Sequence, residues 1–195
     1  MGTDTYMKYP KECTFDGKRV LNLGCGFTVY PAKNVVNLDK FDCCKPDVQW
    51  DLEKVPLPFD DESFDYVIAN HVMEHIHNWW ELFKDCSRIL KVGGVMDIFV
   101  PGMGSDSQLG YRDHVSFISP QSFYGVAGNN YRFANAWAHD QNCEAAAQMR
   151  LTSMTHIMAP AFKGMPQKIK MLAVKYLRNC VVEDHYQFIK EPPHV

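Results

Sequence analysis

Three residues near the middle of the chain match the spacing of an inverted zinc-protease motif. His71, Glu74 and His75 spell H-x-x-E-H, in which two histidines one helical turn apart hold a metal ion and the glutamate acts on the metal-bound water. That chemistry requires both histidines on one helix. The apolar run FDYVIAN (64–70) instead predicts a strand that leads directly into His71. We therefore place the motif at a strand end and in the following loop, and we predict no metal site.

A second group of residues has the types and spacing of a nucleoside-binding site. The run RVLNLG (19–24) predicts a buried strand, and Gly24, Cys25 and Gly26 then lie at its carboxyl edge, where open α/β sheets bind ligands. Glycine lets the backbone approach a cofactor closely, and we interpret Cys25 as a small residue at a crowded turn. Asp39 ends the next predicted strand, where its carboxylate is placed to accept the two hydroxyls of a ribose.

The connection between these two strands argues against a dinucleotide. A dinucleotide-binding turn reads G-x-G-x-x-G, whereas Val29 occupies the third glycine position. Residues 27–34 include Pro31 and are too few for a full crossover helix, whose N-terminus would carry a pyrophosphate. We therefore predict a shortened first crossover and a nucleoside cofactor without phosphates.

Both groups need a sheet whose strand ends meet at one edge, and the pattern from residue 18 to residue 101 predicts such a sheet. Apolar runs alternate with loops and one amphipathic helix, as in a mostly parallel sheet with crossovers. The predicted strands are residues 19–24, 35–39, 64–70 and 94–101, with a weaker one at 47–52. The helix is expected to begin at Asn78, in a capping box with Glu81, and to end at Gly93 and Gly94.

The second half of the chain gives weaker patterns. They predict a short helix at 119–128, an amphipathic helix at 166–179, a closing strand at 180–190, and one or two further strands within 129–165. A chain of 195 residues suits one core. We expect a single α/β domain over residues 1–195, with a Rossmann-like, mostly parallel sheet and flanking helices. Residues 18–101 would form its cofactor-binding core, and residues 102–195 its acceptor side and closing strands.

Composition narrows the class of protein and its expected location. Hydrophobic residues make up 46% and charged residues 22% of the chain, which is typical of soluble globular domains. The net charge of −3 indicates no general attraction to nucleic acids or anionic membranes. Seven cysteines without a C-x-x-C pair, no secretory leader and no apolar run of membrane-spanning length favour a reduced, cytoplasmic protein.

Four blocks of the sequence, in order, resemble the class I S-adenosylmethionine-dependent methyltransferases. The blocks are VLNLGCG, VVNLD, DLEKVPLPFDDESFDYVIANHVMEHI and RILKVGGVMDIFVP. The third and fourth are most similar to the small predicted methyltransferases of the type 11 group. The resemblance implies S-adenosylmethionine as the cofactor. By this resemblance, Gly24 and Gly26 would contact the methionine part of the cofactor, and Asp39 would contact its ribose. Asp51 and the Leu52 backbone would contact the adenine, and Asn70 would lie near the amino acid end or the methyl group.

The acceptor of the methyl group is less marked in the sequence. A sulfonium cofactor is already activated, so such an enzyme mainly aligns the methyl group with the acceptor and excludes water. A general base is needed only when the acceptor must lose a proton. His71 and His75 after the fourth strand, and His114 in the segment after the fifth, are the candidates. We expect a small-molecule or glycan-related acceptor.

Three other functions are compatible with parts of the pattern. A non-catalytic partner subunit could keep the fold and bind S-adenosylmethionine without turnover. A nucleotide-binding oxidoreductase is disfavoured by Val29 and by the short first crossover. A zinc hydrolase would need the helix that the H-x-x-E-H motif lacks.

Overall fold

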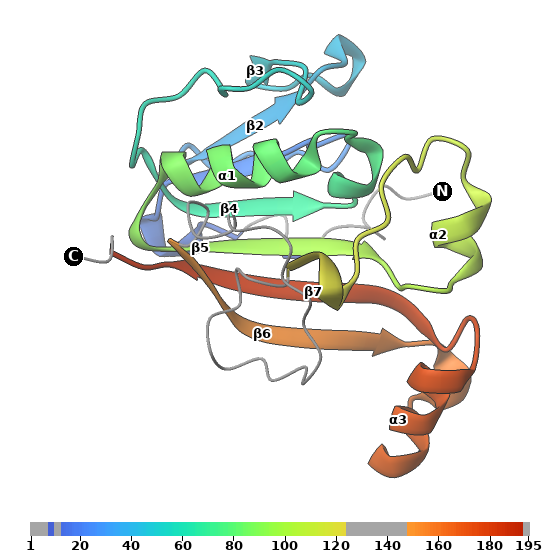
Figure 1. Ribbon diagram of the computed structural model, residues 1–195. Helices are drawn as coiled ribbons and strands as arrows, with labels where there is room; N and C mark the ends of the chain where they lie inside the picture. Colours follow the sequence, from blue (N-terminus) through green and yellow to red (C-terminus); the bar gives the residue numbers. More distant parts are fainter. Residues whose placement is uncertain (1–7, 10–12, 124–147, 193–195) are drawn as a thin grey trace.

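The computed structural model describes residues 8–9, 13–123 and 148–192, and their strands form one seven-stranded sheet (Figure 1). The strands lie in the order β3-β2-β1-β4-β5-β7-β6, and β7 runs antiparallel to both of its neighbours. Their bounds are Val20–Leu23 (β1), Val35–Asp39 (β2), Val48–Gln49 (β3), Phe64–Asn70 (β4), Leu90–Pro101 (β5), Met149–Met158 (β6) and Val181–Lys190 (β7). This is the mostly parallel α/β sheet that the sequence predicts.

Short helices connect these strands. The α-helices are Trp79–Ile89 (α1), Asp106–Gly110 (α2) and Gln167–Tyr176 (α3). The 3-10 helices are Phe15–Gly17 (η2), Asp42–Cys44 (η3), Met73–His75 (η4), Pro120–Phe123 (η5) and Pro160–Phe162 (η8). In the part of the chain that the structure describes, no helix is both long and apolar enough to cross a membrane.

The main core lies between α1 and one face of the sheet (Figure 1). Leu82, Phe83 and Cys86 of α1 are fully buried, as the apolar stripe predicts, and they face buried side chains such as Leu21 and Val67 on the central strands. Each fully buried Leu or Phe side chain stabilises the fold by about 1.5–3 kcal/mol. The loop that enters α1 packs into the same core.

The start of α1 agrees with the prediction, but its capping and its end do not. Asn78 occupies the position before the helix, but its side chain makes no capping hydrogen bond. The carboxylate of Glu53 instead accepts the backbone N–H groups of His77 and Asn78, at 2.9 and 3.4 Å. At the other end, α1 stops at Ile89 and β5 begins at Leu90, because the fully buried Leu90 pairs with Phe64 of β4. Gly93, with φ of +81°, therefore lies inside β5.

The first crossover contains no helix, as predicted. Two buried asparagines on the sheet face opposite α1 hold this loop in place. Asn22 of β1 donates to the carbonyl of Thr28 at 2.8 Å, and Asn37 of β2 exchanges hydrogen bonds with the backbone of Tyr30 at 2.9 and 3.0 Å. The Tyr30 ring then covers this face of the sheet together with Phe15. Side-chain amides thus replace the helix that usually makes this connection.

The remaining predicted elements are partly confirmed. β3 is shorter than residues 47–52, whereas α3 and β7 match the predicted helix at 166–179 and strand at 180–190. β6 confirms one strand within 129–165, and η5 occupies the start of the predicted helix at 119–128. Residues 124–128 and 129–147 of those two predictions lie outside the described residues.

The sheet has its topological switch between β1 and β4. From β1 the chain continues to β2 and β3 on one side, and then to β4 and β5 on the other. Ligands of open α/β sheets bind at the carboxyl ends of the strands where the order reverses. In Figure 1, α2 lies near this edge, beyond the ends of β4 and β5.

Candidate functional site

The glycine turn after β1 has a backbone that requires glycine. Gly24 and Gly26 have φ angles of +59° and +50°, in the left-handed region that other residues rarely adopt. A Cβ atom on Gly24 would lie 2.6 Å from the Val72 side chain, whereas the space around Gly26 is open. Gly24 is thus required by conformation and by packing against the loop after β4, and Gly26 by conformation alone.

Asp39 at the end of β2 holds this turn. Its Oδ2 atom accepts the backbone N–H of Gly26 at 2.8 Å, and its Oδ1 atom accepts that of Phe41 at 2.9 Å. The residue is only 8% exposed. Each carboxylate oxygen has a second lone pair, so the fixed side chain keeps the capacity to accept two further donors, such as the hydroxyls of a ribose.

A cavity of about 580 Å³ adjoins Asp39, within the size range of small-ligand sites. Its wall includes the predicted residues Asp51 and Leu52, and it also includes two aromatic residues that the sequence interpretation missed, Phe41 and Trp50. Both aromatic residues could have been predicted from the sequence, because they lie within two residues of Asp39 and Asp51. Flat rings beside a buried carboxylate suit a nucleoside.

A second cavity, of about 900 Å³, lies next to the first. Both cavities are lined by Gly24, Gly26, Phe27, His71 and His75, so they meet at the glycine turn and at the loop after β4. The second one alone is lined by Asn22, Cys25, Asn70, Glu74, Ser107, Tyr111 and His114 among others. All the predicted cofactor and acceptor residues therefore line one of two adjoining cavities.

His71 is held between two carboxylates. Its Nε2 atom lies 2.8 Å from Oε2 of Glu183, and its Nδ1 atom lies 3.2 Å from Oε1 of Glu74. Burial alone lowers the pKa of His71, but the hydrogen bonds and charges of these two carboxylates outweigh burial and raise the pKa to about 9. An imidazolium that donates from both nitrogens cannot take a proton, so the geometry disfavours His71 as a general base.

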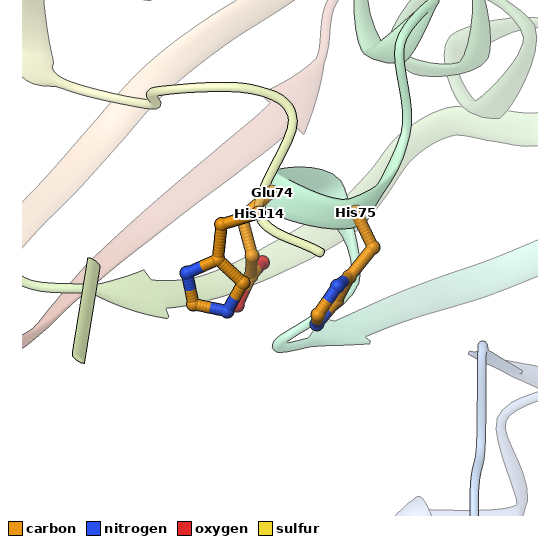
Figure 2. Close-up of side chains that lie close together, drawn as sticks. All are labelled: Glu74, His75 and His114. Atoms are coloured by element: carbon orange, nitrogen blue, oxygen red, sulfur yellow. The ribbon is translucent and has the colours of Figure 1, made fainter. Parts of the chain in front are cut away.

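Glu74, His75 and His114 form a cluster at the wall of the second cavity (Figure 2). Glu74 is fully buried, and its Oε2 atom has no hydrogen-bond partner among the described residues. The two imidazole rings lie 4.8 Å apart, centre to centre, and the Tyr111 ring stacks on His114 at 5.2 Å. The structure thus joins two predicted histidines to the glutamate of the H-x-x-E-H motif.

The two segments that carry this cluster are tied together. The backbone N–H groups of Val115 and Ser116 both donate to the carbonyl of Glu74, at 2.9 and 3.0 Å, and the Ser116 hydroxyl donates to the carbonyl of Ile76 at 2.7 Å. His114 therefore has a fixed position relative to η4. Only the fold could reveal this contact, because the segments are far apart in the chain.

Part of the chain is similar in sequence to known methyltransferases. Residues 21–98 match the type 11 family of methyltransferase domains. A sterol 24-C-methyltransferase, erg6 of Schizosaccharomyces pombe, is 30% identical over 111 residues, which are 46% of this chain and 29% of that protein. The chain therefore spans less than a third of the length of that relative.

Solved structures show the same fold. A methyltransferase from Archaeoglobus fulgidus, described as dependent on S-adenosylmethionine, aligns with a TM-score of 0.63 at 14% identity, over 91% of this chain and 88% of that one. Another, from Mesorhizobium loti, aligns with a TM-score of 0.56 at 14% identity, over 93% and 94%. Residues 21–98 are therefore similar to methyltransferase domains, and the described residues share the fold of these two solved S-adenosylmethionine-dependent methyltransferases.

Proposed function

We propose that the protein transfers a methyl group from S-adenosylmethionine to a small-molecule or glycan-related acceptor bound in the second cavity. The observation that carries this proposal is the fixed carboxylate of Asp39 at the carboxyl edge of the sheet, one strand away from the topological switch. It stands between the glycine turn and a nucleoside-sized cavity, and a second cavity opens directly beside it. This arrangement suits a cofactor that presents a reactive group to a neighbouring substrate.

The residues of the first cavity fit the cofactor. Asp39 has spare lone pairs for ribose hydroxyls, and Phe41, Asp51 and Leu52 line the space for an adenine ring. Neither cavity needs to hold phosphates, which agrees with the absence of a helix after the glycine turn. When bound, S-adenosylmethionine supplies a methyl group already activated by a sulfonium centre.

The side of the second cavity that carries Asn70 would receive the methionine end. Asn70 ends β4 and lines this cavity beside Gly24 and Cys25. The Cys25 thiol is 4% exposed, and burial together with the nearby Asp39 raises its pKa to about 12. Because the thiol stays neutral, it is not a competing nucleophile for the methyl group.

The lining of the second cavity supports a polar acceptor. Glu74, His75, Ser107 and His114 present a carboxylate, two imidazoles and a hydroxyl to the same space. This polar part of the wall can hydrogen-bond an acceptor with hydroxyl groups, whereas one partial relative is a sterol methyltransferase. The exposed Tyr111 ring at this cavity offers a flat surface for the face of a sugar or another ring.

Titration calorimetry with S-adenosylmethionine tests the cofactor half of this proposal. Asp39→Ala is expected to weaken binding about 10- to 100-fold, because hydrogen bonds to a charged group contribute about 1.5–3 kcal/mol. Asp42→Ala removes an exposed carboxylate from the neighbouring 3-10 helix, does not touch either cavity, and is the matched control. Equal affinity in wild type and Asp39→Ala, with both proteins folded by circular dichroism, would show that the ribose assignment is wrong.

A further inference from the structure

We propose that Glu74, His75 and His114 bind a divalent transition-metal ion in the wall of the second cavity. Each of the three offers one ligand atom, and these atoms lie within 4.8 Å of one another. Figure 2 shows the side chains projecting from η4 and from the segment after α2 toward the same space. Ligands of a tetrahedral ion at 2.0–2.1 Å are on the order of 3.4 Å apart, so modest side-chain rotations would close the site.

The hydrogen bonds of the two histidines prepare them as ligands. Nδ1 of His75 lies 3.0 Å from the carbonyl oxygen of Asp113, and Nδ1 of His114 lies 3.2 Å from that of Gln108. A carbonyl oxygen only accepts, so each Nδ1 must carry the proton. The lone pair of the neutral ring is then on Nε2 in both residues. This is the outer support that metal-binding histidines usually have.

Glu74 supplies an independent sign that a cation belongs here. Its side chain is fully buried, with Oε1 hydrogen-bonded to His71 and Oε2 without a partner among the described residues. A buried carboxylate oxygen without a hydrogen bond costs free energy. An ion between Glu74 and the two imidazoles would satisfy that oxygen.

The geometry also explains which letters of the H-x-x-E-H motif take part. Both nitrogens of His71 already face carboxylates, those of Glu74 and Glu183, so His71 has no free ligand atom. His114 from a distant segment takes the place that the motif gives to the first histidine. The sequence predicted no metal because His71 and His75 do not share a helix. The proposed site does not include His71, so the absence of a helix shared by His71 and His75 is no argument against it.

The ligand types select the class of ion. Two imidazoles and one carboxylate suit Zn²⁺, Mn²⁺, Fe²⁺ or Co²⁺, whereas Mg²⁺ and Ca²⁺ prefer sites made only of oxygen atoms. Three protein ligands leave coordination positions open toward the cavity. If the proposed methyl transfer takes place in this cavity, a metal ion here favours acceptors with a hydroxyl group; this step rests on the proposed function. A bound cation lowers the pKa of a coordinated hydroxyl and eases loss of its proton to solvent.

Titration with MnCl₂, followed by the loss of the free-ion electron paramagnetic resonance signal, tests the site directly. Mn²⁺ binds thiolates weakly, which avoids interference from the free cysteines. We expect one Mn²⁺ per wild-type chain. Binding should weaken by at least about 100-fold in Glu74→Gln and in His114→Asn, since loss of a supporting residue alone costs 10- to 100-fold. His77→Asn is the matched control, because His77 is an exposed neighbour that lines neither cavity.

The same titration can overturn the proposal. No stoichiometric binding by the wild type, or wild-type affinity in both variants, would show that the cluster is not a metal site. The optical spectrum with CoCl₂ should lack a thiolate charge-transfer band; such a band would place the ion on cysteine instead. If Glu74→Gln fails to fold, His114→Asn still tests the site, because it changes only a loop residue. Calorimetry with S-adenosylmethionine in metal-free buffer tests the proposed function separately, so either idea can fail alone.

Discussion

Nε2 of His71 lies 2.8 Å from Oε2 of Glu183, and this contact joins the loop after β4 to the antiparallel strand β7 across the intervening strand β5. Lys8 also forms an ion pair with Glu183. Burial raises the pKa of Glu183, but His71 and Lys8 outweigh burial and lower it. A closing strand from the second half of the chain thus helps to hold the wall of the second cavity.

Loss of this contact should be costly. Glu183→Gln is expected to lower the free energy of unfolding by about 1–3 kcal/mol, because a largely buried carboxylate that accepts from two cations is removed. Glu191→Gln removes a carboxylate from a more exposed ion pair with Arg150 and should cost at most about 1 kcal/mol. Urea unfolding measures both. Equal losses in the two variants would contradict the role given to Glu183.

The packing of the glycine turn predicts a specific pair effect. Gly24→Ala should be more destabilising than Gly26→Ala, since both have positive φ but only Gly24 faces a close atom, in Val72. Positive φ alone costs a side chain about 1–2 kcal/mol. Adding Val72→Ala should recover part of the excess loss in Gly24→Ala and none of the loss in Gly26→Ala. A double-mutant cycle in urea checks this, and strictly additive losses would rule out the clash.

A histidine on β6 makes stability depend on pH. Nδ1 of His156 lies 2.5 Å from Oδ1 of Asp184, and this hydrogen bond raises the pKa of His156 above its ordinary 6.5, against the lowering effect of burial. The stabilisation is therefore fully present below pH 6.5 and is lost as the pH rises through the folded-state pKa.

The stability difference between wild type and His156→Asn should accordingly be larger at pH 6 than at pH 9. Chemical unfolding of both proteins at the two pH values measures this difference. Groups that titrate in both proteins contribute equally to both free energies of unfolding, so their contributions cancel in the difference. A difference that is independent of pH, or larger at pH 9, would be inconsistent with the ion pair.

Much of the fold could be predicted because short-range patterns determine it. The apolar runs that became β1, β2 and β4 are bounded by turn residues, and the stripe of α1 has helical spacing. The Asp39 prediction needed only the rule that parallel strands end at one edge. The capping of α1 by Glu53 and its end at Ile89 were not predictable in the same way, because Glu53 comes from a distant segment and β-pairing of Leu90 overrides the helix-ending tendency of Gly93.

The buried polar cluster around Asp97 on the sheet could likewise not be predicted from the sequence. Asp97 lies in the apolar run of β5 and is 1% exposed, yet its carboxylate accepts from Tyr9 and Tyr66, and from His185 at 2.8 Å. These partners come from three separate segments. The cluster of Glu74, His75 and His114 depends in the same way on a contact between η4 and the segment near Ser116. Such long-range contacts leave no periodic signal in one sequence.

The two adjoining cavities are proposed to carry out methyl transfer. The most direct measurement is incubation of the purified protein with isotopically methyl-labelled S-adenosylmethionine and a fractionated extract of small polar metabolites and glycans, with mass spectrometry of each fraction. We expect label in a hydroxyl-bearing small molecule, formed by the wild type and reduced at least about tenfold in Asp39→Ala at limiting cofactor. Tight binding of S-adenosylmethionine with no labelled product in any fraction would contradict it and favour a non-catalytic binding subunit.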